Sequence, residues 1–406
     1  MMKPPNSDLP SQLTDDLDLL ETPSLQVPMI AEDEHIFANG YSYFMAMLQD
    51  IQTATQCIEI ETYIFHNDPL GQRIACALID AAKRGVQVRI LVDGAGSPKW
   101  TTAFARKLET AGAHTRVFHP FPWHLWNWSR SVIKAPTLLK IVYLMLKINF
   151  RNHRKVCLID NKIAYIGSCN ISKCHLDKKH GGESWRDIGV RVCNLHLTEL
   201  IHAFDCAWYH RTISERIRDT FQHIQNDPPF RLNYTRHRRR FLYKHLLQKI
   251  SRCKKKIWIT NAYFVPDNFL LKRLKEAAER QIDVRILLPS ESDVMMMPLA
   301  SSTFYFSLLK AGVRIFEYLP SVLHAKTFIV DDWMLVGSSN LNHRSLLHDL
   351  EVDVNIHNNT AKKQIKQLFL NDLTHSKELS LMDWHRHRPW RQRLMGRLVL
   401  YLKYWI

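Results

Sequence analysis

The phrase His-x-Lys-x-x-x-x-Asp occurs twice in this chain of 406 residues, at positions 153–160 and 324–331. Each copy leads into an apolar run, and each is followed by a small-residue turn that ends in asparagine. The first turn reads Gly-Ser-Cys-Asn at 167–170, and the second reads Gly-Ser-Ser-Asn at 337–340. A reactive phrase that recurs with the same surroundings indicates a duplicated protein, in which both halves contribute to one active site.

The sequence around the two phrases aligns as a repeat of one α/β unit. Paired runs of β-branched and apolar residues predict matching strands, and the amphipathic segments between them predict matching helices. The expected strands are 57–65, 87–93 and 116–118 in the first copy, and 256–264, 283–289 and 314–316 in the second. The expected helices are 69–84 and 102–111, then 268–280 and 303–311. Strand–helix–strand alternation favours parallel pairing, so we expect two mostly parallel sheets flanked by helices, with the active site at the interface of the halves.

The two copies differ by an insertion in the first half. From Phe118 to His153 is 35 positions, whereas from Phe316 to His324 is 8, so the first copy carries 27 additional residues around 119–150. We therefore expect four segments in the chain. They are an acidic N-terminal segment at 1–33, a first half at 34–225, a second half at 226–375 and a basic amphipathic tail at 376–406.

The charge of the chain indicates an anionic partner. Its formal net charge of +16 suits nucleic acid, a phospholipid surface or a phosphate substrate, and does not choose among them. The eight cysteines are scattered without a CxxC pair or zinc-ligand spacing, which indicates free thiols in a reducing compartment and no metal site. The N-terminal segment lacks the apolar core of a secretory signal, and no apolar run approaches the roughly 20 residues that span a bilayer. We expect a soluble or peripheral protein.

These features resemble the phospholipase D superfamily. The resemblance runs from about residue 34 to residue 358 and rests on both phrases, both Gly-Ser-x-Asn turns and the duplicated α/β unit. Within the superfamily, the chain is most similar to bacterial cardiolipin synthases of the short type, which lack an N-terminal membrane anchor. Segments 261–266 and 337–345 strengthen this similarity, while Cys169 occupies a position that is usually small or apolar. The resemblance implies a phosphatidyltransferase that needs no cofactor and forms a covalent phosphohistidine, with retention at phosphorus.

The two phrases supply the groups that phosphodiester exchange requires. His153 and His324 can act as nucleophile and as general acid or base, because imidazole titrates near neutral pH. Residues two apart on a strand share a face, so each histidine is expected beside the lysine of its own phrase. Donors to the phosphoryl oxygens are expected from Lys155, Lys326, Asn170 and Asn340. We favour His153 as the nucleophile and His324 as the acid and then the base, while the residues leave the reverse order open.

Acidic residues complete the predicted site. Asp187 and Glu351 align in the repeat, and we expect them to orient the two histidines through a ring nitrogen. A structural salt bridge is the alternative interpretation of these two residues. Asp160 and Asp331 end the two phrases and belong to the catalytic motif, but we expect them to hold the turns that follow it. The serines of the small-residue turns are expected to shape the backbone rather than to bind a ligand: Ser168, Ser338 and Ser339.

Two segments carry the features of membrane contact. The insertion contains Trp123, Trp126 and Trp128, followed by an apolar stretch interrupted by lysines. In the tail, Trp390 and Trp405 lie on one apolar helical face among basic residues, whose attraction to anionic lipid is worth around 1 kcal/mol each. We predict that both segments contact an anionic phospholipid membrane. The alternatives are a lid over the active site for the insertion and a core-packed helix for the tail.

The leading functional hypothesis is transfer of a phosphatidyl group to a hydroxyl of phosphatidylglycerol, which makes cardiolipin. The expected substrates are phosphatidylglycerol and, as a second candidate donor, phosphatidylethanolamine. We expect the protein to be peripheral on the cytoplasmic face of the bacterial inner membrane. A hydrolytic phospholipase D or a phosphatidylserine synthase would use the same site with another acceptor. A nuclease is less favoured, because superfamily nucleases are often short chains with one motif, so no nucleic-acid partner is expected; the oligomeric state stays open.

Overall fold

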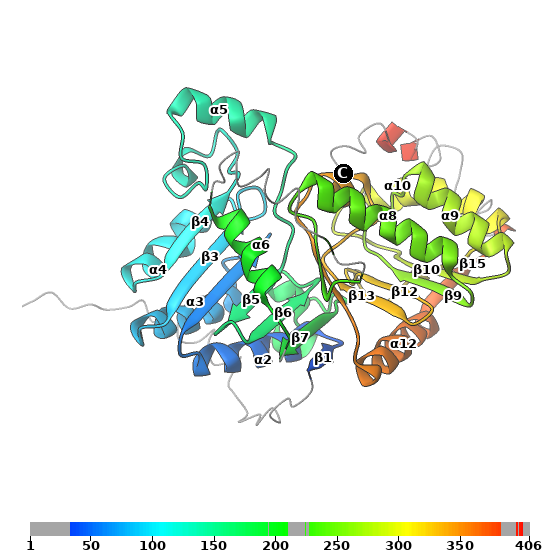
Figure 1. The fold of residues 1–406 in the computed structure, drawn as a ribbon, viewed down its shortest axis with the longest axis horizontal. Coiled ribbons are helices and arrows are strands. Elements are labelled where there is room, and N and C mark those ends of the chain that lie inside the picture. The colour runs from blue at the N-terminus through cyan, green and yellow to red at the C-terminus, as the bar shows by residue number, and fades with distance from the viewer. Residues whose placement is uncertain are drawn as a thin grey trace, which may run out of the picture.

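The computed structural model describes residues 33–193, 195–209, 224, 227–382, 395–396 and 398–400. Its strands form two sheets, one in each half of the repeat, which lie side by side in Figure 1. The first sheet has the order β1-β7-β6-β5-β2-β3-β4 and consists of β1 (Glu34–Phe37), β2 (Cys57–Thr62), β3 (Gln87–Asp93), β4 (His114–Phe118), β5 (Val156–Ile159), β6 (Ile163–Gly167) and β7 (Gly189–Cys193). The second sheet has the order β15-β11-β10-β9-β12-β13-β14-β8 and consists of β8 (Phe230–Leu232), β9 (Lys256–Thr260), β10 (Asp283–Pro289), β11 (Arg314–Tyr318), β12 (Thr327–Val330), β13 (Trp333–Gly337), β14 (Val352–Asn355) and β15 (Ser376–Leu379).

Both sheets are mixed, and the same strand order recurs in them. Strands β2, β3 and β4 pair in parallel, as do β9, β10 and β11, whereas the other pairs of named strands are antiparallel. The predicted duplicated α/β fold with flanking helices is confirmed, but the expectation of mostly parallel sheets is wrong. The strands within the two phrases, β5 and β12, turn back at once into β6 and β13, and such short connections join only antiparallel strands.

The helices connect the strands and cover the sheets (Figure 1). The helices of the first half are α2 (Gly40–Thr53), α3 (Pro69–Lys83), α4 (Arg106–Thr110), α5 (Thr137–Leu146) and α6 (Thr198–Trp208). Those of the second half are α8 (Arg236–Arg252), α9 (Asn268–Glu279), α10 (Met297–Lys310), α11 (His343–Leu347) and α12 (Asn359–Thr374). The equivalent helices α3 and α9 end within one residue of the predicted bounds. An aspartate caps each of them, because Asp68 accepts a hydrogen bond from the Gly71 amide and Asp267 accepts one from the Leu270 amide.

One hydrophobic core joins the two halves. It contains Val190 and Val192 of the first sheet, Val352 and Val354 of the second sheet, and Phe204 of α6. Each sheet also has a core of its own beneath the helices that cover its other face. Because the two sheets bury apolar faces against each other, each half stabilises the other.

The described residues extend beyond the second half as it was predicted. Strand β15 pairs with β11 and adds a strand past the expected end of that half. In the tail, Val399 is buried against α10, whereas Leu398 is exposed. Residues 1–32 and the predicted membrane contacts Trp390 and Trp405 lie outside the described residues. Within the described ranges, no helix combines the length and the apolar character needed to cross a membrane.

The insertion forms a projection on the first half. Its helix α5 stands away from the sheets at the top of Figure 1. Lys140 and Leu144 of this helix are buried. The outer side of the helix exposes apolar side chains: Leu138, Leu139, Val142, Met145 and Leu146. This arrangement is the reverse of an ordinary surface helix, whose apolar side faces the core and whose charged side faces water.

Candidate active site

The two phrases meet at the interface between the halves. The sequence predicted that each histidine and lysine lie on a strand, but β5 and β12 begin directly after the lysines. The histidines therefore lie in the segments that lead into these strands. Backbone hydrogen bonds fix both segments across the interface. The His153 amide donates to the Leu350 carbonyl at 3.0 Å, and the His324 amide donates to the Arg186 carbonyl at 2.9 Å.

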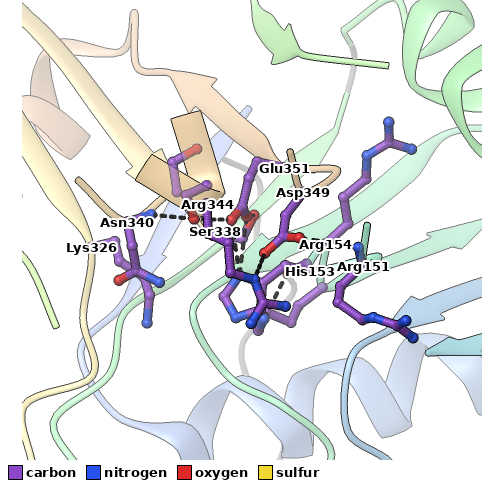
Figure 2. A network of polar contacts seen from close by, with 12 residues as sticks. Arg151, His153, Arg154, Lys326, Ser338, Asn340, Arg344, Asp349 and Glu351 are labelled. Atoms are coloured by element: carbon purple, nitrogen blue, oxygen red, sulfur yellow. Dashed lines mark hydrogen bonds and ion pairs between the residues drawn. The ribbon is translucent and has the colours of Figure 1, made fainter. Parts of the chain in front are cut away.

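Each histidine ring is held by a carboxylate from the opposite half. His153 Nδ1 lies 3.1 Å from both carboxylate oxygens of Glu351 (Figure 2), and His324 Nδ1 lies 2.8 Å from Oδ1 of Asp187. The sequence predicted these two carboxylates, and the structure pairs each with the histidine of the other half. A ring that is held at Nδ1 has Nε2 as its reactive nitrogen. Neither half alone therefore contains a histidine of the phrases together with the carboxylate that holds it.

The two lysines lie beside the histidines in equivalent positions. Lys155 Nζ donates to the His153 carbonyl at 2.7 Å, and Lys326 Nζ donates to the His324 carbonyl at 2.5 Å. Burial lowers the pKa of Lys155 to about 7 and the pKa of Lys326 to about 8. A bound phosphate would raise both pKa values again, because a nearby negative charge favours the ammonium form. The lysines are thus placed to bind an anion at the interface.

The two asparagines approach the interface from β6 and β13. Each follows the Gly-Ser turn at the end of its strand, and each is buried. Asn170 Oδ1 accepts the Ile64 amide at 3.3 Å, whereas Asn340 Oδ1 has no hydrogen-bond partner among the described residues. Figure 2 shows Asn340 and Lys326 beside each other. The structure thus brings the asparagine, lysine and histidine of the phrases to one interface.

The aspartates that end the phrases bind backbone groups in the hairpin turns. The Asp160 carboxylate accepts the amides of residues 55–57 at 2.7 to 3.0 Å, and the Asp331 carboxylate accepts the amides of residues 254–256 at 2.9 to 3.1 Å. Both aspartates have positive φ angles, of 50° and 53°, which aspartate adopts more readily than most residues. Their carboxylates therefore fix the starts of β2 and β9, whereas the sequence had led us to expect them to hold the turns that follow the phrases.

A third histidine, not among those predicted from the sequence, joins the His324 side of the site. His175 Nδ1 lies 2.6 Å from Oδ2 of Asp187, while the other oxygen of the same carboxylate binds His324. The Asn170 amide donates to Nε2 of His175, so this nitrogen keeps its lone pair and His175 contacts Asp187 as a neutral donor through Nδ1–H. Burial alone would raise the pKa of Asp187, but His175 and His324 hold it well below its usual range. Asp187 is therefore ionised at neutral pH.

The repeat contains the signal that could have revealed this histidine. His175 follows Asn170 by five residues, as Ser345 follows Asn340. In the structure, Ser345 Oγ donates to the Glu351 carboxylate. The carboxylate that holds His153 thus has a hydroxyl donor where the carboxylate that holds His324 has an imidazole N–H donor.

The two sides of the site consequently hold their protons differently. Burial, with Lys326 as the next cause, lowers the pKa of His324 to about 3, so His324 is neutral at neutral pH beside the ionised Asp187. Burial lowers the pKa of His153 well below its ordinary value and raises the pKa of Glu351 to about 7. The His153–Glu351 pair therefore gains and loses one proton near neutral pH.

The turn serines have a second role beyond backbone shape. Ser168 Oγ donates to Asp187 at 2.7 Å, and Ser338 Oγ donates to Glu351 at 2.5 Å. These hydroxyls hold the two carboxylates in the positions that the histidine rings require. The sequence had assigned them to turn formation alone.

One cluster in the described residues carries atoms of the type that bind metals. Cys169, His175 and Asp187 each place one such atom within 4.8 Å of the others. Both ring nitrogens of His175 are already hydrogen-bonded, to Asp187 and to the Asn170 amide. Burial also raises the pKa of the Cys169 thiol well above its ordinary value, which opposes the thiolate form that binds metals. Hydrogen bonding within the chain accounts for this cluster.

Comparison with known proteins identifies the family. Residues 47–181 and 246–373 match the family model described as cardiolipin synthase, PLD-like domain. The chain is 32% identical to a cardiolipin synthase of Geobacillus sp. (strain WCH70) over 372 residues, which cover 89% of this chain and 70% of that protein. It is 30% identical to a cardiolipin synthase of Staphylococcus aureus (strain N315) over 366 residues, which cover 88% and 70% of the two chains. The chain therefore belongs to the cardiolipin synthase family, a family of phospholipase D-superfamily enzymes, as the sequence predicted.

Solved structures show where the same fold occurs. The phosphatidylserine synthase of Haemophilus influenzae Rd KW20 superposes with a TM-score of 0.64 at 14% identity, covering 91% of this chain and 92% of that chain. The polyphosphate kinase of Porphyromonas gingivalis superposes with a TM-score of 0.54 at 11% identity, covering 99% and 59%. At these identities the likeness concerns the fold alone, and it agrees with the duplicated architecture described above.

Proposed function

We propose that this protein transfers a phosphatidyl group from a phospholipid to a hydroxyl of phosphatidylglycerol and so makes cardiolipin. The observation that supports this most directly is the pair of crossed histidine–carboxylate contacts, with a buried lysine beside each ring. Two imidazoles at one interface supply a nucleophile and an acid, and charged donors stabilise the phosphoryl oxygens. The donors proposed here are Lys155, Lys326, Asn170 and Asn340.

The reaction would proceed in two displacements at the donor phosphate, which lies between the two rings. In the first, Nε2 of one histidine attacks phosphorus, the bond to the head-group oxygen breaks, and the other histidine gives that oxygen a proton. The head group leaves as an alcohol, and the phosphatidyl group stays on the first histidine. In the second, the acid histidine, now neutral, takes the proton of the acceptor hydroxyl, whose oxygen attacks phosphorus and releases the first histidine. Two inversions give retention at phosphorus.

The surroundings of the rings favour His324 as the nucleophile and His153 as the acid, the reverse of the order favoured from the sequence. His324 stays neutral because burial and then Lys326 lower its pKa to about 3, and a neutral imidazole has the lone pair that attack requires. The His153–Glu351 pair titrates near neutral pH, which suits an acid that must give up one proton and then regain it.

The acceptor distinguishes the proposed function from its alternatives. Water in place of the lipid alcohol would make the protein a hydrolytic phospholipase D, and serine would make it a phosphatidylserine synthase. Relatives named cardiolipin synthase that match most of this chain favour the lipid alcohol. The apolar insertion close to the His153 side is consistent with a site that keeps water away from the phosphohistidine.

We also propose that the insertion binds an anionic membrane surface. Trp123 and Trp126 are 55% and 50% exposed, whereas Trp128 is half-buried beside Lys140. With the exposed apolar side of α5, the first two tryptophans form a surface that suits the interfacial region of a bilayer. The net charge of +16 adds attraction to anionic lipid. A peripheral position on the cytoplasmic face of a bacterial inner membrane is part of this proposal.

The test is incubation of the purified protein with phosphatidylglycerol vesicles, with and without phosphatidylethanolamine, and identification of the lipid products by mass spectrometry. Cardiolipin from the intact protein, and none from folded His153→Ala and His324→Ala variants, would support the transferase. Lys244→Gln, which removes an exposed charge of α8, is the control for charge alone. Phosphatidic acid as the sole product would show a hydrolase, and no lipid product would overturn the proposal.

A further inference from the structure

A large cavity lies between the insertion, the end of α6 and the start of α8. Its volume is about 860 Å³, and the end of α5 with the segment after it forms one side. Much of the wall is apolar or aromatic, including Phe118, Ile133, Tyr143 and Phe150. Sites for small organic ligands commonly have volumes of roughly 300–1,000 Å³. The cavity is therefore large enough for part of an amphiphilic molecule.

The charged side chains that line the cavity in the described residues are all basic: Lys147, Arg236, Arg239 and Arg240. Arg239 is only 8% exposed. Its guanidinium donates to the carbonyls of Asn233 and Leu347, both at 3.0 Å, and lies over the Phe150 ring. Within the described part of the chain, no carboxylate forms an ion pair with Arg239. A buried cation that has only carbonyl partners is unfavourable, and an anion in the cavity would stabilise it.

The cavity adjoins the His153 side of the active site. Leu350 lines the cavity, and its carbonyl accepts the His153 amide. The next residue, Glu351, holds the His153 ring. The insertion leaves the first sheet at the end of β4 and ends directly before the first phrase, which contains His153 and leads into β5. A molecule in the cavity therefore lies next to the reacting centre.

The proposed reaction requires a second anion-binding site, near the one that holds the donor phosphate. Phosphatidylglycerol as acceptor carries a phosphate that does not react, separated from its reacting primary hydroxyl by the glycerol unit. This phosphate cannot occupy the position of the donor phosphate between the two histidines. It needs a cation of its own within the length of a glycerol unit, and its acyl chains need an apolar path toward the membrane.

We propose that this cavity binds the acceptor phospholipid, with its phosphate at Arg239, Arg236 and Arg240 and its glycerol hydroxyl directed toward His153. The acyl chains lie along the aromatic wall beneath α5, whose outer side contacts the membrane. The histidine nearest the cavity is then the one that takes the proton of the acceptor hydroxyl in the second step. This inference rests on the proposed transferase function and adds the location of the acceptor.

Competition between two acceptors tests this location. Ethanol accepts a phosphatidyl group without a lipid-binding site, so phosphatidylglycerol vesicles with added ethanol yield both cardiolipin and phosphatidylethanol. In Arg236→Gln/Arg240→Gln we expect the ratio of cardiolipin to phosphatidylethanol to fall about tenfold, which corresponds to about 1.4 kcal/mol of lost acceptor binding. Lys244→Gln, another exposed cation of α8, is the matched control. A ratio that equals the control's would overturn the inference, whereas an intact protein that forms neither product would overturn the proposed function.

A second variant fills the cavity and leaves its charges in place. Cys206 of α6 lines the cavity, and a tryptophan there would occupy volume meant for the lipid. We expect Cys206→Trp to lower the same product ratio, while Cys76→Trp, at an exposed position of α3, keeps the ratio of the parent. Thermal unfolding followed by circular dichroism checks that each variant is folded. A folded Cys206→Trp variant with the parent's ratio would exclude the cavity as the acceptor site.

Discussion

His175 and Ser345 occupy equivalent positions in the two halves, but one is an imidazole and the other is a hydroxyl. The Asn170 amide donates to His175 Nε2 at 3.1 Å, and the Asn340 amide donates to Ser345 Oγ at 3.2 Å. Each residue also contacts the carboxylate that holds a histidine of the phrases. The duplicated site is therefore chemically asymmetric, and asymmetry is what a two-step exchange requires, because one histidine must attack while the other gives a proton.

An activated leaving group should separate the roles of the two histidines. A p-nitrophenyl phosphodiester of a short-chain lipid releases a stable phenolate, so it needs little help from an acid. We expect His153→Ala to keep at least about a tenth of the parent's p-nitrophenol burst, because the acid is dispensable for this leaving group. His324→Ala should lose the burst, because it lacks the proposed nucleophile. Stopped-flow absorbance measures both, and the opposite ranking would assign the attack to His153.

Replacement of His175 by serine should change how activity depends on pH. Without the Nδ1–H donor of His175, the Asp187 carboxylate would stabilise the protonated form of His324 more strongly, and the pKa of His324 would rise from about 3. A protonated nucleophile cannot attack, so kcat/KM should fall about tenfold near pH 6 and recover as the pH rises. Ser345→Ala serves as the control in the equivalent position. An equal loss at every pH, with a lower melting temperature, would instead show a structural role for His175.

The buried lysines predict the alkaline limit of activity. Their pKa values in the folded protein, about 7 for Lys155 and about 8 for Lys326, lie below the ordinary value for lysine. Both lysines of the free enzyme therefore lose their charge as the pH rises through this range, and kcat/KM should decline from about pH 7 upward. Bound phosphate raises both pKa values, so kcat should decline only at higher pH. A kcat/KM that stays level beyond about pH 9 would contradict these assignments.

The lowered pKa of Lys155 also predicts how the stability of the fold depends on pH. Lys155 binds a proton more weakly in the folded chain than in the unfolded chain, so its protonation favours unfolding. This destabilisation is fully present below about pH 7 and fades as the pH rises toward about 10, the ordinary pKa of lysine. Lys155→Met should therefore raise the melting temperature at neutral pH while it abolishes turnover. Differential scanning calorimetry at pH 7 and pH 9.5 checks the sign, because the gain should be smaller at the higher pH; an unchanged or lower melting temperature at pH 7 would refute it.

The repeat made much of the fold predictable. Equivalent segments before each phrase show the same hydrophobic pattern, and the aspartate caps of α3 and α9 mark helix starts directly in the sequence. The direction in which the strands pair was less predictable, because strand–helix–strand alternation describes only the three parallel strands of each half. The hairpins that follow Lys155 and Lys326 contribute antiparallel strands, which turned the expected parallel sheets into mixed ones.

The candidate site could be predicted as a set of residues but not as a set of pairs. Asp187 and Glu351 were identifiable because they align in the repeat, yet their partners depend on how the two sheets pack against each other. His175 was not predicted, because its equivalent in the second half is a serine. The two halves therefore share no residue type at this position that would indicate a role in the site. The exposure of the apolar side of α5 could not be predicted from the sequence either, because an apolar helix pattern does not indicate which side faces the core.

The crossed pairing also determines when the protein becomes active during its synthesis. The ribosome releases His153, Lys155 and Asp187 with the first half, while Glu351 emerges only about two hundred residues after His153, at the start of β14. Until then His153 has no carboxylate and Asp187 has no His324 to hold. On the mechanism proposed above, a nascent chain therefore lacks the complete site, with both histidine–carboxylate pairs formed, until β14 has joined the second sheet.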